Sequence, residues 1–450
     1  MDLNFVRRHW WSVYIVLYAI AFWPLPQPNE SGGGQIRVLI TFFAVLGGFF
    51  LTWTAYPDLR LSNIKNAVPF FKKHLAPLFA LLFGFWAVIS SFFSNTPIIG
   101  LLGSLDSNID SAIGSLMLSF VFFLVYFEIL RDEKIKNALI STIKYLLILL
   151  LVLSVIEVIL KKSFLVPSAL PSDLPVLNFG SNGHLGGLLI LLSGGFFSFL
   201  GSSFWGTLFL LTFASFGIGL ASSKSPYISL AAILVFLGVN KKFKIALASL
   251  GAILLGAVLA SGLVFLINQT TSKRDFTAPA QYQLRPILYK TALKGILAKP
   301  IFGYGGPQFN EAWSRIMTQA EITRFFHDST GQIYVKTFRD EKSGIEMFQV
   351  KDHNNKLAFT SAPNWKAHNQ FLDIALMWGL VGLIFYVCLI FLSFKNLFKF
   401  NFFSFAIFAY MIWNLFWYME IEAEGIFFVI LAASCVLDKN VSRDKDIIKA

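Results

Sequence analysis

The sequence has few charged residues and almost no cysteine. Charged residues make up 14% of the 450 residues, against about 25% in soluble domains, which argues against a string of soluble domains. The two cysteines, Cys388 and Cys435, both lie inside apolar runs, so they are predicted to be small buried side chains rather than a disulfide or a metal site. With 56% hydrophobic residues and 50 phenylalanines, the chain is predicted to be one polytopic membrane domain.

Motifs of several common enzyme chemistries are also missing. No histidines or cysteines have the spacing H-x-x-x-H, H-E-x-x-H or C-x-x-C, so neither a metal nor another cofactor is predicted. The sequence contains no Walker loop and no G-x-S-x-G turn, and the G-Y-G-G at 303–306 follows no nucleotide-binding strand and helix. Nucleotide-driven and hydrolytic chemistry therefore have little support, and no nucleic-acid partner is predicted.

Long apolar runs are what the sequence has in abundance. A membrane helix needs about 20 apolar residues, and twelve segments approach or exceed this length. We therefore predict an all-α polytopic membrane protein with about twelve transmembrane helices, the first of them an uncleaved N-terminal span. The predicted spans are 10–25, 36–56, 75–93, 112–130, 143–160, 183–200, 204–221, 226–239, 245–268, 369–394, 402–419 and 424–437.

The lysines and arginines between these spans predict the orientation of the chain. With the N-terminus in the cytoplasm, the inner segments contain 18 Lys or Arg. The short outer loops contain only Lys161, Lys162 and Lys224, with Arg37 at a boundary. Both termini are therefore predicted to be cytoplasmic.

One outer loop, residues 269–368, differs from the others in length and charge. It contains 14 Lys or Arg and 8 Asp or Glu, a net charge of +6. Its first part predicts a helix, with apolar residues every four positions from Leu284 to Ile296 and with Pro286 in the first turn. Residues 331–362 predict a small insert like a β-hairpin, made of three short strands. The predicted division is transmembrane helices 1–9 at 1–268, a loop domain at 269–368, and transmembrane helices 10–12 with a cytoplasmic tail at 369–450.

Two of the six histidines, His184 and His368, lie at the outer ends of predicted spans. A lone histidine in such a place is usually structural, but with a pKa near about 6.5 it can also take a proton from a hydroxyl. The basic outer loop suits an anion, because guanidinium groups hold phosphate through paired donors. Together these features suit a reaction in which a sugar hydroxyl displaces a lipid diphosphate. Two or three fixed cations would stabilise that leaving group without a metal.

Four segments resemble motifs of the O-antigen ligase and polymerase superfamily. "HNQFLDIALMWGLVG" fits H-N-x(9)-G-x-x-G, and "LRPILYKTALKGILAKPIFGYGGPQF" resembles an R-x-x-x-aromatic segment followed by P-x-x-G-x-G. "FGSNGHLGG" is similar to F-G-N-x-N-H-x-A-G, and "GIGLASSKSPYISLAA" resembles S-R-G-A-x-x-A-L with Lys224 in place of the arginine. Each motif alone is loose, but the set, with the predicted spans and large outer loop, indicates the superfamily.

The resemblance implies an enzyme of the bacterial inner membrane that transfers a glycan from undecaprenyl diphosphate on the periplasmic face. It implies that His368 assists the acceptor hydroxyl and that Arg285 holds the diphosphate. Lys224 would replace a second arginine but would lose its forked donors. The further residues predicted to bind substrate are Asn369, His184, Tyr289 and Lys290.

The predicted function is that of a metal-independent O-antigen ligase in contact with membrane lipids, with a hydroxyl of lipid A-core as acceptor. Alternatives within the class are an O-antigen polymerase, which joins undecaprenyl-diphosphate-linked repeat units, and a protein O-oligosaccharyltransferase. A flippase or other transporter of lipid-linked glycans would line its pathway with mid-span Arg or Lys, and here these residues gather at span ends. Positive charge concentrated in a single outer loop favours one diphosphate site, and hence the ligase over the polymerase.

Overall fold

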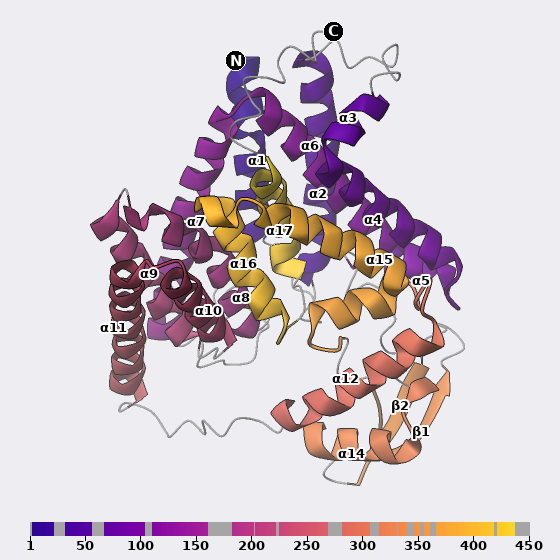
Figure 1. The fold of residues 1–450 in the computed structure, drawn as a ribbon. Coiled ribbons are helices and arrows are strands. Elements are labelled where there is room, and N and C mark those ends of the chain that lie inside the picture. Colours follow the sequence, from indigo (N-terminus) through magenta and orange to yellow (C-terminus); the bar gives the residue numbers. More distant parts are fainter. Residues whose placement is uncertain are drawn as a thin grey trace.

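Helices form almost all of the computed structural model, and a small sheet lies at one end (Figure 1). The structure describes residues 2–21, 32–55, 67–103, 110–160, 182–201, 203–221, 225–268, 281–306, 315–330, 332–339, 346–351, 355–360, 366–417 and 421–436. Helices labelled α are α-helices and those labelled η are 3₁₀ helices. Before the large loop, the helices are α1 Leu3–Ala19, α2 Gly32–Ala55, α3 Ala67–Lys73, α4 Leu75–Phe92, α5 Pro97–Leu102, α6 Ala112–Arg131, α7 Lys134–Leu160, α8 Asn182–Gly194, η3 Gly195–Gly201, α9 Phe204–Leu220, α10 Ser225–Val239 and α11 Phe243–Asn268. The loop contributes α12 Gln281–Ala298, α14 Gln319–Thr330, β1 Ile333–Arg339, β2 Glu346–Lys351 and β3 Leu357–Thr360, and the chain continues with α15 Gln370–Phe394, η4 Leu397–Lys399, α16 Phe402–Asn414 and α17 Ile421–Cys435.

Each predicted span overlaps a helix of the structure, and residues 22–25, 56, 418–419 and 437 of these spans lie outside the described residues. Among the described residues, six helices are long and apolar enough to cross a membrane: Ile36–Ala55, Leu75–Phe92, Ala112–Arg131, Lys134–Leu160, Phe243–Leu266 and Gln370–Lys399. Five further apolar helices are shorter: Gly183–Phe199, Phe204–Leu220, Ser225–Val239, Phe402–Asn414 and Ala423–Cys435. The prediction of an all-α polytopic membrane protein is confirmed.

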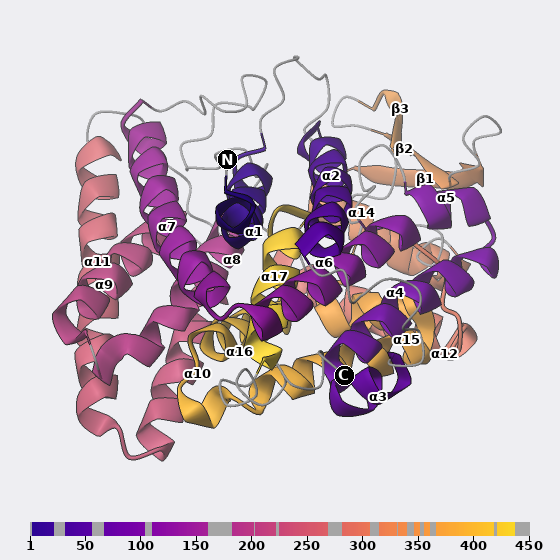
Figure 2. The same cartoon turned by 90° about the horizontal axis from the view of Figure 1, so that it is seen from above.

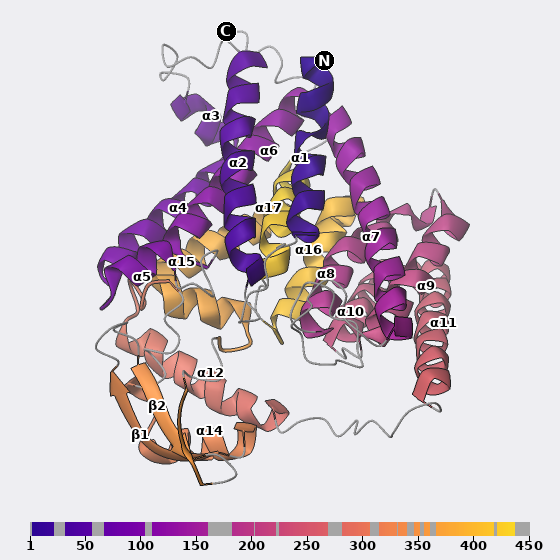
Figure 3. The same cartoon turned by 180° about the vertical axis from the view of Figure 1, so that it is seen from behind.

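The helix α6 lies at the centre of the bundle because it is apolar on all sides. It packs against α2, α4 and α17, and its residues from Val121 to Leu130 are almost all buried. Figure 2 shows α9 and α11 side by side at one flank and α4, α5 and α15 at the other. In the view from behind, α1 and α2 lie next to each other in front of this core (Figure 3).

The outer loop forms a small domain at the end of the bundle opposite the start of α1 (Figures 1 and 3). Its three strands make an antiparallel sheet in the order β1-β2-β3, which confirms the predicted strands. In the central strand, the alternating residues Phe348 and Val350 are fully buried and lie on one face of the sheet. Phe348 packs on Phe326 of α14, with ring centroids 5.3 Å apart. This face of the sheet therefore closes the core of the domain.

The predicted apolar stripe of α12 is confirmed at the three positions whose side chains are described: Leu288, Ala292 and Ile296 are buried. Pro286 does not stand in the first turn, however, because the helix begins at Gln281 and contains the proline as its sixth residue. The missing N–H of proline is tolerated there at the cost of one helical hydrogen bond.

Helix α15 is broken at Gly379, and the chain that follows α12 is fastened into the break. We call these two segments, 300–305 and 376–380, the joint. Gly379 has φ 69° and ψ 180°, a conformation open almost only to glycine. The break leaves backbone groups without helical partners, and the segment after α12 supplies them. The bonds run from Tyr304 N to Leu376 O (2.9 Å), from Gly305 N to Met377 O (2.8 Å) and from Leu380 N to Pro300 O (2.7 Å).

The two backbones of the joint approach so closely that side chains would not fit between them. A Cβ on Gly303 would lie 2.5 Å from the carbonyl oxygen of Leu376, and one on Gly379 would overlap the carbonyl of Ile301. The end of α4 holds the joint from a third side, because Phe302 stacks on Phe93, the residue directly after that helix, with ring centroids 3.9 Å apart. The loop domain is thus fixed to the membrane bundle at one defined place.

Candidate functional site

Three predicted site residues from separate segments gather around one indole ring, that of Trp417 just after α16. The guanidinium carbon of Arg285, on α12, lies 5.5 Å from the ring centroid. The imidazole of His368 meets the ring edge-on at 5.2 Å and 80°. His184, near the start of α8, lies at 6.5 Å and 81°. A cation and two imidazoles are thereby brought together at the end of the bundle where α12 lies against it.

His368 occupies a sharp turn, residues 366–369, which we call the His368 turn. Its φ of 59° is uncommon for a residue with a side chain, so surrounding contacts must hold it. Its Nδ1 lies 3.2 Å from the carbonyl oxygen of Lys366. A carbonyl only accepts, so in the neutral ring Nδ1 carries the proton and Nε2 is the basic nitrogen. The hydroxyl of Tyr289 donates to the carbonyl oxygen of His368 at 3.2 Å.

The environment of His368 keeps its imidazole neutral. Burial, together with the nearby positive charges of Arg285 and Lys366 and the ring of His184, lowers its pKa to about 4, although the bond to the carbonyl of Lys366 opposes the change. At neutral pH, Nε2 is therefore ready to accept a proton, as a general base requires. Burial also raises the pKa of Tyr289, with Arg285 opposing, so its hydroxyl keeps the proton that it donates.

Asn369 uses its side chain to hold the backbone on both sides of the turn. Its Oδ1 accepts from the amides of Phe371 and Leu372, each at 3.1 Å, which caps the first turn of α15. Its Nδ2 donates to the carbonyl oxygen of Leu415 at 2.9 Å. These bonds give Asn369 a positioning role, and its predicted contact with substrate stays a prediction.

Two carboxylates anchor the other side of the His368 turn. The ammonium of Lys366 lies 2.8 Å from Oδ1 of Asp110, and both side chains are almost fully buried. Oδ1 of Asp373, on the first turn of α15, accepts from the amide of Ala367 at 2.7 Å. Burial alone would lower the pKa of Lys366, but the carboxylates of Asp110, Glu424 and Asp373 outweigh it and raise that pKa. Lys366 is thus a buried, charged anchor beside the turn.

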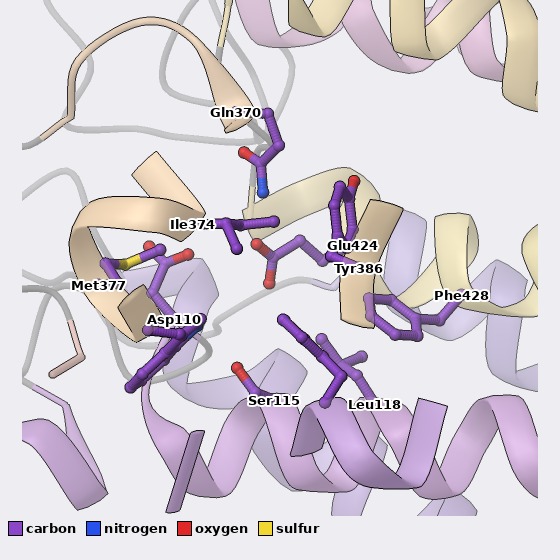
Figure 4. A pocket seen from close by; sticks show the side chains of 11 residues that line it. Asp110, Ser115, Leu118, Gln370, Ile374, Met377, Tyr386, Glu424 and Phe428 are labelled. Carbon is purple, nitrogen blue, oxygen red and sulfur yellow. The ribbon is translucent and has the colours of Figure 1, made fainter. Parts of the chain in front are cut away.

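A small cavity extends from this anchor into the bundle. Figure 4 shows Asp110, Gln370 and Glu424 around it, and Tyr386 and Trp378 are among the apolar residues that complete its wall. Its volume of about 20 Å³ is enough for about one water molecule. The cavity is too small for a sugar or a diphosphate, so it belongs to the support of the turn and not to a substrate path.

The remaining predicted residues are not brought to Trp417 in the described part of the chain. Lys290 points to α14, where its ammonium lies 3.1 Å from Glu321. The amide of Thr318 and the lysines Lys290 and Lys294 lower the pKa of Glu321 to about 2, so the pair stays ionised. Lys224 lies outside the described residues.

The structure adds four residues that the sequence motifs did not indicate: Trp417, Lys366, Asp110 and Asp373. Trp417 and Asp110 stand at outer ends of predicted spans, and Lys366 directly precedes the His-Asn pair. A search of the sequence for polar or aromatic residues at the outer ends of the predicted spans would have found these residues. It would not have predicted which of them contact one another. No group of three or more His, Cys, Asp or Glu among the described residues has the arrangement of a metal site.

Fold and site together define a polytopic membrane protein in which a helix after the membrane bundle places an arginine beside a histidine. The family model described as O-antigen ligase matches residues 208–339. The match confirms the resemblance to that superfamily, and it supports a glycosyltransferase-like enzyme of the ligase or polymerase type. It includes Arg285 and Tyr289 but not His184 or His368. No curated protein matches the chain.

Proposed function

We propose that the protein transfers a glycan from undecaprenyl diphosphate to a hydroxyl of lipid A-core on the periplasmic side of the inner membrane. The observation that carries this proposal is the shared ring of Trp417, which has the guanidinium of Arg285 at 5.5 Å and the imidazole of His368 at 5.2 Å. A fixed cation and a neutral base so close together match the two needs of the reaction. One stabilises a leaving diphosphate, and the other accepts the proton of the attacking hydroxyl.

In the proposed step, the acceptor oxygen forms a bond to the anomeric carbon of the first sugar. The bond between that carbon and the diphosphate oxygen breaks, and its electron pair leaves with undecaprenyl diphosphate. Nε2 of His368 takes the hydroxyl proton, because Nδ1 is committed to the carbonyl of Lys366. Arg285 faces the departing negative charge, and Lys224 is the second candidate cation.

The proposed orientation places both termini in the cytoplasm and the loop domain in the periplasm. It rests on the 18 Lys or Arg of the inner segments against the few in the short outer loops. Since Arg285 and Lys224 would supply the positive charge, the transfer is proposed to be independent of metal. We expect it to continue in millimolar EDTA, and a loss restored by Mg²⁺ or Mn²⁺ would contradict this part of the proposal.

The role of His368 is tested by His368→Ala in membranes supplied with lipid-linked glycan and lipid A-core. We expect transfer to fall about 10²–10⁴-fold, the usual contribution of a general base, with normal insertion and thermal stability. His327→Ala, on the exposed side of α14, is the matched control and should keep full activity. Wild-type transfer by His368→Ala would remove His368 from the mechanism.

The products separate a ligase from a polymerase. A ligase moves a finished chain once, so a deletion strain should accumulate long glycans on undecaprenyl diphosphate and bare lipid A-core. A polymerase extends chains on the carrier, so its deletion should leave only single repeat units, on the carrier or on the core. The second pattern would replace the proposed acceptor with a lipid-linked glycan but would keep the diphosphate donor.

A further inference from the structure

A second, larger cavity lies at the opposite end of the bundle from the loop domain. It has a volume of about 410 Å³, within the range of about 300–1,000 Å³ typical of small-molecule sites. Its walls are the start of α7, the η3 turn and the link from η4 into α16. The start of α7 is tied to the start of α1, because Asp132 lies 2.6 Å from Arg8. The cavity therefore opens at the end where the chain begins.

The lining of this cavity is basic. Lys134, Lys136 and Lys399 line it from two segments far apart in the sequence, against the single acid Glu133. A further ammonium, that of Lys242 between α10 and α11, lies 5.8 Å from the ring centroid of the lining residue Phe400. Three lysines thus line one hollow and a fourth lies near one of its lining residues, an arrangement that attracts an anion.

The polar side of the cavity is held in place by the protein itself. Lys136 is buried, and its ammonium donates to the carbonyl oxygen of Val436 at the end of α17 at 3.2 Å. Asn401 caps α16 through bonds of 3.0 and 3.2 Å to the amides of Phe403 and Ser404. These groups form a fixed wall, while Lys134 and Lys399 are exposed and are able to close on a ligand.

The cavity also has an apolar side, and a large apolar side chain is exposed close to it. Phe199, Phe402 and Phe403 line it, and Phe398, beside Lys399, is 70% exposed. Large exposed apolar side chains next to lysines are typical of the level at which lipid headgroups meet the hydrocarbon. A ligand that bears both an anionic phosphate and an apolar tail fits both sides of such a site.

We propose that this cavity binds a phosphate ester, supplied by the headgroup of an anionic phospholipid. Basic pockets between transmembrane helices are suited to such headgroups because each lysine near the surface attracts them. Under the orientation proposed above, the site faces the cytoplasmic leaflet. It is separate from the transfer site and would hold the ends of α7, α16 and α17 together at the far side of the bundle.

The test compares lipid binding to the purified full-length protein by native mass spectrometry. Phosphatidylglycerol is titrated against phosphatidylcholine with the same acyl chains. Wild type should retain phosphatidylglycerol preferentially, and Lys134→Gln/Lys399→Gln should weaken this binding about 25-fold, since each lysine contributes a factor of about five. Lys134→Arg/Lys399→Arg should keep it, because the charges remain.

The matched control removes the same charge elsewhere at the same end. Lys72→Gln/Lys73→Gln, on exposed positions of α3 (Figure 1), should leave phosphatidylglycerol binding unchanged. A competition with inorganic phosphate distinguishes the sources: no competition at millimolar phosphate supports the lipid, whereas full competition supports a soluble phosphate ester at the same lysines. Equal retention of the two lipids, or wild-type binding by the Lys134→Gln/Lys399→Gln protein, would overturn the proposal.

Discussion

The joint and the His368 turn fix two parts of the same site by different physical means. The joint uses backbone hydrogen bonds and two glycines at which a Cβ would not fit. The turn uses charged side chains, with Lys366 and Asp110 buried 2.8 Å apart. The joint therefore sets the place of a whole helix, α12 with Arg285, while the turn sets a single imidazole. Close backbone packing fixes the joint and a buried ion pair fixes the His368 turn, so substitutions should affect the two differently.

The largest effect is expected from Gly379→Ala, which breaks the joint. The new Cβ would overlap the carbonyl of Ile301, and the left-handed φ of 69° adds about 1–3 kcal/mol of strain. We expect a clearly lower melting temperature in detergent, faster proteolysis of the loop domain and almost no transfer. Gly251→Ala in α11 is the control, because a Cβ there meets no atom within 4 Å. A Gly379→Ala protein with wild-type melting and proteolysis would show that the joint is not what fastens the domain.

The local features of the loop domain were predictable from sequence because their causes are local. The period of the apolar residues predicted the buried face of α12 at Leu288, Ala292 and Ile296, and the short runs between polar turns within 331–362 predicted the strands. The glycines of the joint were visible as motifs, but not their pairing. Gly303 and Gly379 meet only because the helix breaks at the second, and nothing in the local pattern indicates that break.

The anchor of the His368 turn could not be predicted, because its partners lie far apart in the sequence. Asp110 and Lys366 are separated by 256 positions, and the ring of Trp417 contacts residues of three separate segments. The sequence predicted Asn369 as a substrate ligand, which stays a prediction, and the structure adds that its side chain caps a helix. A resemblance identifies which residues matter, but their division into reacting and positioning groups requires the fold.

The next largest effect is expected from Asp110→Asn, which breaks the turn. Removing one partner of a buried ion pair typically destabilises by about 3–5 kcal/mol, and replacing both by apolar groups restores much of this. We expect Asp110→Asn to lower the melting temperature and Asp110→Asn/Lys366→Met to recover most of the loss. Lys290→Met, which breaks the exposed pair with Glu321, should change stability by less than about 1 kcal/mol. Equal melting of Asp110→Asn and wild type would argue against the anchor.

A smaller effect is expected from Arg285→Lys, which keeps the joint and the charge but removes the paired donors. Losing one charge-assisted hydrogen bond corresponds to about a tenfold to hundredfold slower transfer, without a change in melting temperature. Arg324→Lys, at an exposed position of α14, is the control, and Lys224→Arg should be tolerated or improve transfer. Wild-type rates for Arg285→Ala would refute a grip of this arginine on the diphosphate.

The smallest effect is expected from a change of pH. It distinguishes the His368 turn from the joint, because the imidazole of His368 titrates near its pKa of about 4 and the joint contains no such group. The pKa of His368 is lowered to about 4, so the base form is complete above about pH 5 and is lost as the pH falls through 4. The contribution of His368 to the kcat/KM of transfer should therefore stay level from about pH 7 to pH 5, instead of falling near the usual histidine pKa of about 6.5. Binding of the anionic donor beside Arg285 offsets the positive charge that disfavours the imidazolium. The acidic limb of kcat should consequently lie at higher pH than that of kcat/KM.

The variant Arg285→Gln should also move the inflection of kcat/KM to higher pH, while the control Arg324→Gln should not. An inflection of kcat/KM at pH 6 or above in the wild type would mean that His368 is more solvated than the turn allows, or that another group is the base.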